Sequence, residues 1–438
     1  SNHIAKKGFG ANSCGIKPYK THNEFFALEF GVKAKEVDEI IQDNKVRGNR
    51  ARIVVPTDEN YINWSIRFVS EKHPEWIEDK RSLEEIKVHP SLSQYYHVQP
   101  FEIYNANILS ENSNIWLEKN KVANQSRITI DSEKIDRSLN SGIDSIIVSS
   151  RGVMRVQTIS GITRNIYGSL RILRHESDLL PIALLSMDSY LIGVIDAELG
   201  RLDHIELWKA QAILSRTWAM RNYKKFSKEG FPFGLTDDVR SQAFHGWTMN
   251  TNRLLKLKSA VKKTSNTYVA DANKRPIEAL FHANSGGQTI PSGWYFNSRS
   301  SLVAVEDSFS LNAPQTFWEK RIDKKQWLAF GFRIFNKDSL DLEFSKFILS
   351  FQQPERLESV VFGGVKKRLR IFRERFSLRS TWFSVVDSDD TYVTLKGRGY
   401  GHGIGMSQEG ALKMAQSGYF ADQIIKFYYP NSFLEKYE

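Results

Sequence analysis

Hydrophobic and polar positions alternate through the middle of the chain. Between about residues 106 and 175, short stretches rich in apolar and β-branched residues are separated by turn residues, which predicts a run of antiparallel strands. The stretches are NIWLEKN, SRITIDS, DSIIVSS, VMRVQTIS and SLRILRHE. A longer apolar stretch follows, IALLSMDSYLIGVIDAELGRL. We predict that it begins as a strand and that Glu198 lies in a loop after it.

The clearest helical pattern begins at Asp203 and runs through DHIELWKAQAILSRTWAMRNYKKF. Asp203 is a favourable N-cap, and Glu206 three residues later completes a capping-box pattern. Residues recurring at helical spacing predict one buried stripe, made of Leu207, Ala210, Leu214 and either Thr217 or Trp218. Lys209 and Arg216 are seven residues apart and share a different face.

The texture of the chain divides it near residue 105. Residues 1–105 are polar and irregular, and we treat them as an N-terminal accessory region of unknown role, in which EFFALEF predicts part of a helix. Residues 106–438 form the second region, with a longer, charged, strand-rich insertion at about 300–390. Near the end, Ser407 is placed to cap a helix over QEGALKMAQ.

Glycine occupies every second position in KGRGYGHGIGMSQEGA, from Gly397 to Gly405. We predict a strand with one face free of side chains. Nucleotide binding through G-x-G-x-x-G is excluded because the spacing is wrong. Glycine inside a strand usually marks close approach by a ligand or by another segment. Two interpretations therefore stand: the floor of a functional groove, or tight packing within the protein.

Composition limits the classes of partner and cofactor that the sequence suggests. Lysine and arginine outnumber acidic residues by 61 − 50 = 11, which favours an anionic partner such as nucleic acid, a membrane surface or a cell-wall polymer. The single cysteine, Cys14, excludes an intramolecular disulfide. Neither H-E-x-x-H nor C-x-x-C occurs, so we predict no metal and no cofactor. The longest apolar run, LLPIALLSM, is too short for an integral membrane segment.

Three stretches carry candidate chemistry. Glu198 is flanked by Ala197 and Leu199, a setting that would raise its pKa by desolvation, as a general acid requires. Ser285 precedes two glycines in ANSGGQT, which suits a serine nucleophile, a loop that offers backbone N–H groups to a substrate, or a plain turn. The basic run KKRLRIFRERFSLR would suit nucleic acid, although we favour a strand with a solvated cationic face.

Six stretches together resemble the stage II sporulation protein D family, whose other branch is the amidase enhancers. They are YLIGVIDAELG, KAQAILSRTWAMR, EALFHANSGGQT, LRSTWF, GRGYGHGIGMSQEGALKMA and IIKFYYPNS. The resemblance covers roughly residues 110–438 and leaves residues 1–105 unmatched. It implies that Glu198 is the catalytic acid. It also implies substrate-binding roles for Lys209, Gln211, Arg216, His282, Ser285, Gly286, Gly287, Tyr400, His402, Gly403 and Gln408.

The family resemblance implies a peptidoglycan lytic transglycosylase acting on glycan strands denuded of stem peptides, in the periplasm or otherwise exported after removal of a signal peptide. The partners implied are the glycan strands and an amidase or another cell-wall hydrolase, with no nucleic acid. Two departures stand out: Asp196 replaces a proline of the family, and the block LTDDVRSQAFHGW lacks the cysteines of metal-binding members. We therefore expect no zinc site.

We expect an α+β fold, predominantly antiparallel, with one central helix lining a substrate cleft. Lys209 and Arg216 would neutralise the lactyl carboxylates of muramic acid, and the glycine strand would form the floor under the glycan. Trp247, Trp294 and Tyr295 would stack on sugar rings. The alternatives are a non-catalytic glycan-binding or amidase-activating protein, a nucleic-acid-binding protein, and a hydrolase with Ser285 as nucleophile.

Overall fold

A computed structural model describes most of the chain after residue 152. Backbone and side chains are described for residues 153–156, 163–171, 180–295 and 302–437. Outside those ranges the structure describes strand backbones only, within residues 27–150 and at 157, 172–175 and 178–179. The chain forms two compact units, one of Ser1–Glu198 with Asn222–Lys262 and one of Leu199–Arg221 with Lys263–Glu438.

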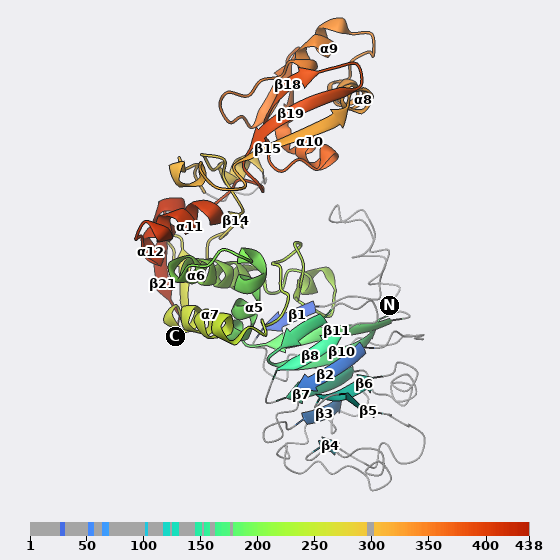
Figure 1. Cartoon of the computed structure of the whole chain (residues 1–438), viewed down its shortest axis with the longest axis vertical. Helices are drawn as coiled ribbons and strands as arrows, with labels where there is room; N and C mark the ends of the chain where they lie inside the picture. Colours follow the sequence, from blue (N-terminus) through green and yellow to red (C-terminus); the bar gives the residue numbers. More distant parts are fainter. Residues whose placement is uncertain are drawn as a thin grey trace. The chain divides into compact units, whose positions relative to one another are not determined.

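Two sheets build the first unit (Figure 1). The larger has the strand order β12-β1-β11-β10-β7-β3-β4, and the smaller has the order β5-β6-β2-β8-β9. Pairing is antiparallel except for β1 with β11 and β3 with β4. The bounds are β1 (Ala27–Phe30), β2 (Ala51–Pro56), β3 (Trp64–Val69), β4 (Phe101–Ile103), β5 (Leu117–Val122), β6 (Gln125–Ile130), β7 (Ser145–Ser150), β8 (Met154–Gln157), β9 (Thr163–Ile166), β10 (Ser169–His175), β11 (Asp178–Leu185) and β12 (Leu235–Thr236).

The strands predicted between residues 106 and 175 are confirmed, as β5 to β8 and β10. Strands β1, β2 and β3 precede residue 105 and pair with strands that follow it, so both sheets include chain from either side of that position. The helix predicted at EFFALEF is wrong, because β1 pairs there with β11 and β12. A short apolar run suits either element, and strand pairing decides between them.

The first unit also contains α5 (Met187–Leu199), η4 (Ser227–Glu229) and most of α7 (Thr251–Lys263). Ser186 caps α5, since its hydroxyl accepts a hydrogen bond from Ser189 N at 3.2 Å. The middle of α5 is buried on every side, since residues 189–195 are all buried. Glu198 therefore lies in the last turn of a helix, and its predicted loop position is wrong.

The second unit begins with α6 (Ile205–Asn222), the helix predicted from Asp203. The predicted stripe is buried, but Gln211, Ser215 and Arg216 are fully buried as well. The carboxylate of Glu206 accepts hydrogen bonds from Ala421 N at 3.0 Å and Lys209 Nζ at 2.6 Å. Most of the surface of α6 is therefore buried.

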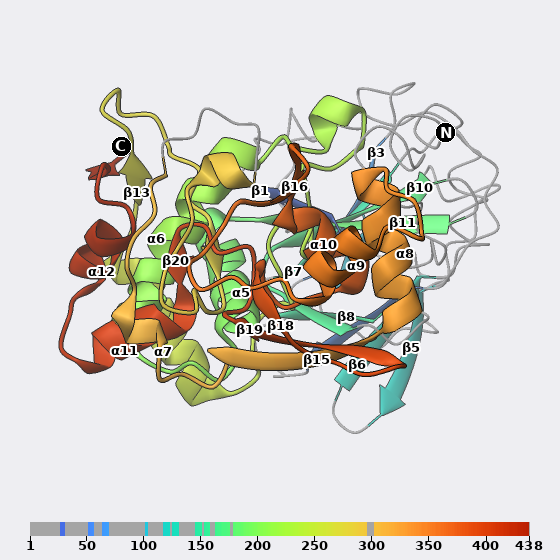
Figure 2. The ribbon, with the colours of Figure 1, turned by 90° about the horizontal axis from the view of Figure 1, so that it is seen from above.

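Within the second unit, helices α8, α9 and α10 cover one face of the sheet β15-β19-β18 (Figure 2). This part spans the insertion predicted to be strand-rich; its strands are confirmed as β15 to β18, but its three helices were not predicted. The bounds are β15 (Phe317–Asp323), α8 (Lys324–Phe335), α9 (Leu342–Leu349), β16 (Ser359–Phe362), β17 (Val365–Arg368), α10 (Leu369–Phe376), β18 (Trp382–Ser388) and β19 (Tyr392–Arg398).

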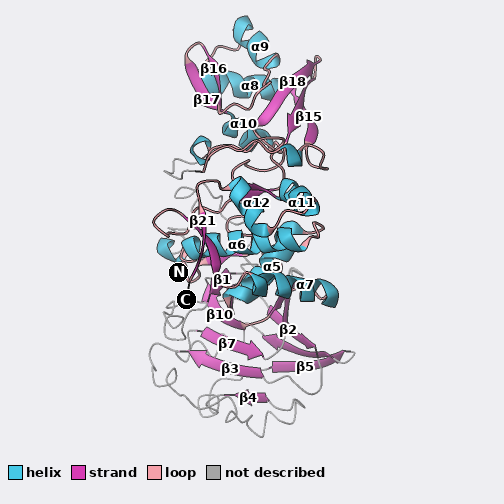
Figure 3. Cartoon of the chain, turned by 90° about the vertical axis from the view of Figure 1, so that its left-hand side faces the viewer, coloured by secondary structure: helices cyan, strands magenta, loops and turns pink. Residues whose placement is uncertain are grey.

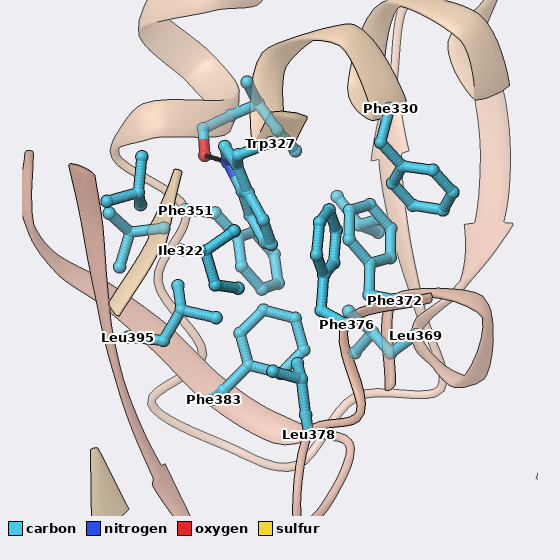
Figure 4. Packing of buried hydrophobic residues seen from close by; sticks show 14 of the residues in the cluster. Ile322, Trp327, Phe330, Phe351, Leu369, Phe372, Phe376, Leu378, Phe383 and Leu395 are labelled. Carbon is cyan, nitrogen blue, oxygen red and sulfur yellow. Dashed lines mark hydrogen bonds between the residues drawn. The ribbon is translucent and has the colours of Figure 1, made fainter. Parts of the chain in front are cut away.

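Aromatic rings fill the core between these helices and the sheet (Figure 4). Trp327 packs against Phe372 and Phe376, with ring centroids 5.5 and 5.2 Å apart, and its indole N–H donates to Ile348 O at 3.1 Å. The predicted cationic strand at residues 366–379 is mostly α10. Leu369, Phe372 and Phe376 are buried at helical spacing, which places the arginines on the outer face.

The remaining elements of the second unit are short. They are β13 (Thr267–Ala270), β14 (Phe281–His282), η5 (Ser292–Trp294), η6 (Ser308–Ser310), β20 (Met406–Ser407), α11 (Gln408–Gln416), α12 (Ala421–Tyr428) and β21 (Phe433–Lys436). Ser407 caps α11 as predicted, accepting from Gly410 N at 3.2 Å. α11 and α12 lie side by side (Figure 3). The mixture of helices and mostly antiparallel sheets confirms the α+β class. None of the described helices has the length and apolarity to cross a bilayer.

Candidate functional site

Glu198 is the half-buried carboxylate at the end of α5. Its Oε1 accepts a hydrogen bond from Ala243 N at 2.7 Å. Burial raises the pKa of Glu198, and the hydrogen bond from Ala243 opposes that rise without cancelling it. The C-terminal end of a helix also disfavours negative charge. The surroundings of Glu198 therefore favour its protonated form more than water does.

The segment after η4 lies along α5 and supplies this environment. Tyr190 donates to Gln242 Oε1 at 2.8 Å, and its ring stacks on Phe244 with centroids 5.9 Å apart. Gly193 allows the close approach, because a Cβ there would overlap the ring of Phe244. Further along, Trp247 Nε1 donates to Ser189 O at 2.9 Å. These contacts fix the Ala243 N–H beside Glu198.

Three aspartates, one on α5 and two in this segment, are paired with arginines. Asp196 pairs with Arg253, and Asp238 pairs with Arg240 at 2.7 Å. Asp237 accepts from Arg164 at 2.8 Å, although its burial still raises its pKa to about 6. No ion pair joins Glu198 to another described residue, which distinguishes it from these three aspartates.

The block that carries metal ligands in some relatives was predicted to hold no zinc here. His245, the histidine of this block, is an exposed residue. Its pKa is lowered, mainly because its ring is partly desolvated. Within the part of the chain that the structure describes, no group of three or more His, Cys, Asp or Glu side chains could hold a metal ion.

The tryptophan and tyrosine predicted to stack on sugars are largely covered. Trp247 is only 5% exposed, since Tyr167 stacks on it at 4.7 Å and Lys258 Nζ lies 4.7 Å from its ring centroid. Tyr295 is buried too, and Trp294 is partly buried. Trp247 and Tyr295 therefore serve packing, which corrects their predicted role.

Of the alternating glycines, Gly397 lies in β19, and the other four do not form a strand. β19 ends at Arg398, and Gly399, Gly401, Gly403 and Gly405 have φ angles of +79°, +113°, +86° and +68°. The residues between them are not among those with positive φ, so the sign of φ alternates along the segment. Glycine is required at these four positions because residues that have a side chain rarely adopt a positive φ angle. We call residues 397–405 the signature loop.

The close approach permitted by these glycines is made by the protein itself. A Cβ at Gly399 would lie 2.8 Å from Asn284 O, and one at Gly401 would lie 2.7 Å from His282 Cβ. A Cβ at Gly403 would overlap Arg356, and one at Gly405 would overlap Leu280 O. The predicted glycan floor is therefore wrong, and tight packing within the protein is the correct interpretation.

His282 and His402 lie together beside this loop, with ring centroids 5.5 Å apart. His282 Nδ1 bonds to Ile404 O at 3.1 Å, while His402 Nδ1 accepts from Ile404 N at 3.0 Å. Burial, followed by the charge of Arg373, lowers the pKa of His402 to about 4. Burial also lowers the pKa of His282 well below its usual range. Both rings are therefore neutral at pH 7.

The Ser-Gly-Gly loop is occupied by internal hydrogen bonds. Ser285 is fully buried, donates to Asp307 at 2.7 Å and lies 2.7 Å from Ser310 Oγ. Gly286 N donates to Asn284 Oδ1 at 2.7 Å, and Gly287 N donates to Ser310 Oγ at 3.0 Å. These partners give Ser285 a structural setting rather than that of a nucleophile, and the backbone N–H groups are already used.

The two cations predicted to line the cleft already have partners within the protein; Arg216 is buried, and Lys209 is partly exposed. Lys209 pairs with Glu206 at 2.6 Å. Arg216 is completely buried and donates to Thr267 O at 3.0 Å. Gln211 donates to Ser215 Oγ at 3.0 Å and accepts from Gln408 at 3.5 Å. Tyr400 is the predicted substrate contact whose side chain is most exposed, at 41%.

Arg356 was missed by the sequence prediction and lies at the centre of these contacts. Its guanidinium donates to Ser285 O at 2.9 Å and to Gln288 O, and it fills the space beside Gly403. The surrounding sequence, QQPERLES, carries no pattern that would have singled it out. It joins the Ser-Gly-Gly loop to the signature loop.

Comparison with known proteins finds one family model and several relatives that are similar to this chain. A family model described as stage II sporulation protein (SpoIID) matches residues 175–270. This range includes Glu198, α6 and the segment after η4. Stage II sporulation protein D of Bacillus subtilis (strain 168) is 30% identical over 275 residues, covering 57% of this chain and 77% of that protein.

Two further relatives extend the likeness. Stage II sporulation protein D of Bacillus amyloliquefaciens is 29% identical over 273 residues, covering 57% of this chain and 76% of that protein. The amidase enhancer of Bacillus subtilis (strain 168) is 26% identical over 298 residues, covering 56% of this chain and 40% of that protein.

Proposed function

The chain belongs to the stage II sporulation protein D family, and on that basis we propose that it is a peptidoglycan lytic transglycosylase whose acid and base is Glu198. The observation that carries the proposal is the state of this carboxylate. It is half-buried, its pKa is raised by desolvation, and it has no ion-pair partner among the described residues. A general acid needs a raised pKa to hold its proton near neutral pH.

The reaction would proceed in two proton transfers. Neutral Glu198 donates its proton to the glycosidic oxygen of N-acetylmuramic acid, and the C1–O bond breaks with its electron pair going to the departing fragment. The 6-hydroxyl of the same sugar then bonds to C1 and gives its proton to the Glu198 carboxylate. The glycan keeps a 1,6-anhydro end, the other fragment leaves with a free hydroxyl, and Glu198 is neutral again.

One carboxyl group is sufficient for this chemistry. Hydrolytic glycosidases use a pair of carboxyl groups. Here the nucleophile belongs to the substrate, and an intramolecular nucleophile has a high effective concentration. Asp196, Asp237 and Asp238 are each paired with an arginine, which supports the assignment of a single working carboxylate.

Such a substrate implies a location and partners. Peptidoglycan lies outside the cytoplasm, so we propose that the protein is periplasmic or otherwise exported. The net charge of +11 suits an anionic glycan whose muramic carboxylates are free. An amidase that removes stem peptides would be a natural partner.

A second function is favoured by one relative. The amidase enhancer of Bacillus subtilis carries its role in its name. A protein that binds glycan and activates an amidase would not require Glu198 to transfer protons. The same assay separates the two functions.

The test is mass spectrometry of glycan strands incubated with the full chain. Wild type should generate anhydromuramyl ends, and Glu198→Gln should lower their rate of formation about 10³-fold, within the range for general acid–base groups. Asp188→Asn, at the exposed start of the same helix, is the matched control and should keep wild-type activity. If neither wild type nor Glu198→Gln cleaves while both sediment with glycan, the amidase-activating function replaces the enzyme.

The pH dependence gives a second check. Glu198 must be protonated in the free enzyme, so kcat/KM should fall as pH rises through its pKa. Because that pKa is raised, the fall should lie above the ordinary glutamate value of about 4.3. A rate that increases through this range would contradict the role of Glu198 as acid.

A further inference from the structure

Four arginines of the second unit form no ion pair with any described residue: Arg356, Arg373, Arg379 and Arg398. Nearby cations do have carboxylate partners, since Arg370 pairs with Glu374 at 2.6 Å and Arg321 pairs with Asp389 at 3.0 Å. The four arginines fall into two pairs, each with a shared contact. Arg373 Nε donates to Arg379 O at 3.4 Å, and Arg356 and Arg398 both lie over Trp382.

Three chain segments meet where two of these arginines emerge. Phe317 and Trp382 both face Arg398 in the registers of β15 and β18 with β19. Gly399 N donates to Thr316 O at 2.7 Å, and Gly401 N donates to Arg379 O at 2.8 Å. This end of the sheet therefore brings residues 316–317, 379–382 and 398–401 together.

Two aromatic rings at this place face solvent. Phe317 is 65% exposed and Tyr400 is 41% exposed. The guanidinium of Arg398 lies 5.7 Å from the Phe317 ring centroid, and that of Arg379 lies 5.4 Å from the Tyr400 centroid. Each exposed ring thus carries an adjacent cation.

No carboxylate of a described residue forms an ion pair with any of these four arginines, so their positive charge has no counterion among the described residues. Arg356 is buried and donates only to the carbonyl oxygens of Ser285 and Gln288. The Nε atoms of Arg356 and Arg398 are buried without a hydrogen bond to a described residue. Burial, and then the charge of Arg398, lower the pKa of Arg356 to about 9, so it stays charged at pH 7. Buried charge without a counterion is costly, and an anionic ligand would relieve that cost.

We propose that Phe317, Arg379, Arg398 and Tyr400 form a subsite for a sugar acid of the glycan strand. The rings would pack against the apolar face of a pyranose, and the guanidinium groups would hold its carboxylate through charged hydrogen bonds. This inference rests on the proposed function, because it takes muramic acid with a free lactyl carboxylate as the ligand. The inference assigns to Arg379 and Arg398 the carboxylate-binding role that was predicted for Lys209 and Arg216.

The experiment measures the affinity of full-length Glu198→Gln for glycan strands freed of stem peptides, which this variant holds without cleaving. Changing Arg379 or Arg398 to Gln in that background should weaken binding about 10- to 100-fold, the usual range for a charged hydrogen bond. Arg321→Gln is the matched control. Arg321 lies on the same sheet, 4.3 Å from the ring of Tyr392, but has Asp389 as its partner. Its substitution should leave the affinity unchanged.

A chemical control identifies the ligand group. Glycan whose lactyl carboxylates have been converted to amides should bind weakly, and the arginine substitutions should weaken it no further. Equal binding of the acid and amide forms, or an equal loss with Arg321→Gln, would overturn the subsite. Competition by inorganic phosphate as strong as that by free muramic acid would replace the sugar acid with a phosphate polymer.

Two safeguards keep the outcomes separate. Arg379 is exposed, so Arg379→Gln and Phe317→Ala decide the question if Arg398→Gln fails to fold. Carboxylate-dependent binding without cleavage by wild type would refute the proposed enzyme and leave the subsite intact. Cleavage by wild type without any preference for free carboxylates would refute the subsite alone.

Discussion

Glu198 and the signature loop have opposite surroundings. In the first unit, a half-buried carboxylate receives one backbone N–H and keeps a raised pKa. In the second unit, the glycines pack closely against other residues of the chain. Ser285 and Asn284 donate hydrogen bonds to the carboxylates of Asp307 and Glu409. The repetitive glycine pattern reflects the backbone conformation that this loop adopts, whereas the carboxylate proposed as the acid is distinguished by its raised pKa and its lack of an ion pair with a described residue.

Substitution within the signature loop should have the largest effect on stability. Gly405→Ala would impose positive φ on alanine and drive its Cβ into Leu280 O, and we expect a loss of about 3–5 kcal/mol from strain and overpacking together. Gly418→Ala is the matched control, since φ is +91° but the space is open, and it should cost about 1 kcal/mol. Denaturant unfolding of the two variants measures the difference. Equal losses would show that close packing of the loop contributes nothing.

Removal of the Ser285 hydroxyl should have an intermediate effect. Ser285→Ala takes a donor from Asp307 and an acceptor from Gly287 N, which should cost about 1–3 kcal/mol. Ser308→Ala, an exposed serine nearby, should cost almost nothing. Thermal unfolding distinguishes the two. A stable Ser285→Ala protein that has lost all cleavage would support a serine nucleophile instead.

Neutralising Glu198 should have the smallest effect on stability, and in the opposite direction. With a folded pKa above the unfolded one, the folded state holds its proton longer, so Glu198 lowers stability as pH rises through that window. Glu198→Gln should therefore melt above wild type at pH 7 and converge with it in acid below about pH 4.3. Melting temperatures across this range test the sign. A gap that favours wild type at pH 7 would contradict the raised pKa.

Local patterns predicted much of the fold. Period-two alternation identified β5 to β8 and β10, and helical spacing identified α6. The cap at Ser407 followed from residue type alone. Helices α8 to α10 were missed because they are short and their aromatic residues also suit strands.

The candidate site was less accessible to sequence reasoning. The flanking apolar residues correctly indicated that the pKa of Glu198 would be raised by desolvation. Alternating glycines suggested a bare strand, because the residues that pack against them, Asn284, Leu280 and Arg356, lie far away in sequence. Burial of Arg216 and Gln211 likewise depends on how α6 is enclosed within its unit, which spacing along one helix does not reveal.

The most direct test places the two regions side by side. The rate of anhydromuramyl-end formation would be measured for Glu198→Gln and Ser285→Ala at equal concentrations of folded protein. We predict a loss of about 10³-fold for Glu198→Gln and a rate near wild type for Ser285→Ala. The reverse result, with Glu198→Gln active and Ser285→Ala inactive, would contradict the assignment of the chemistry to Glu198.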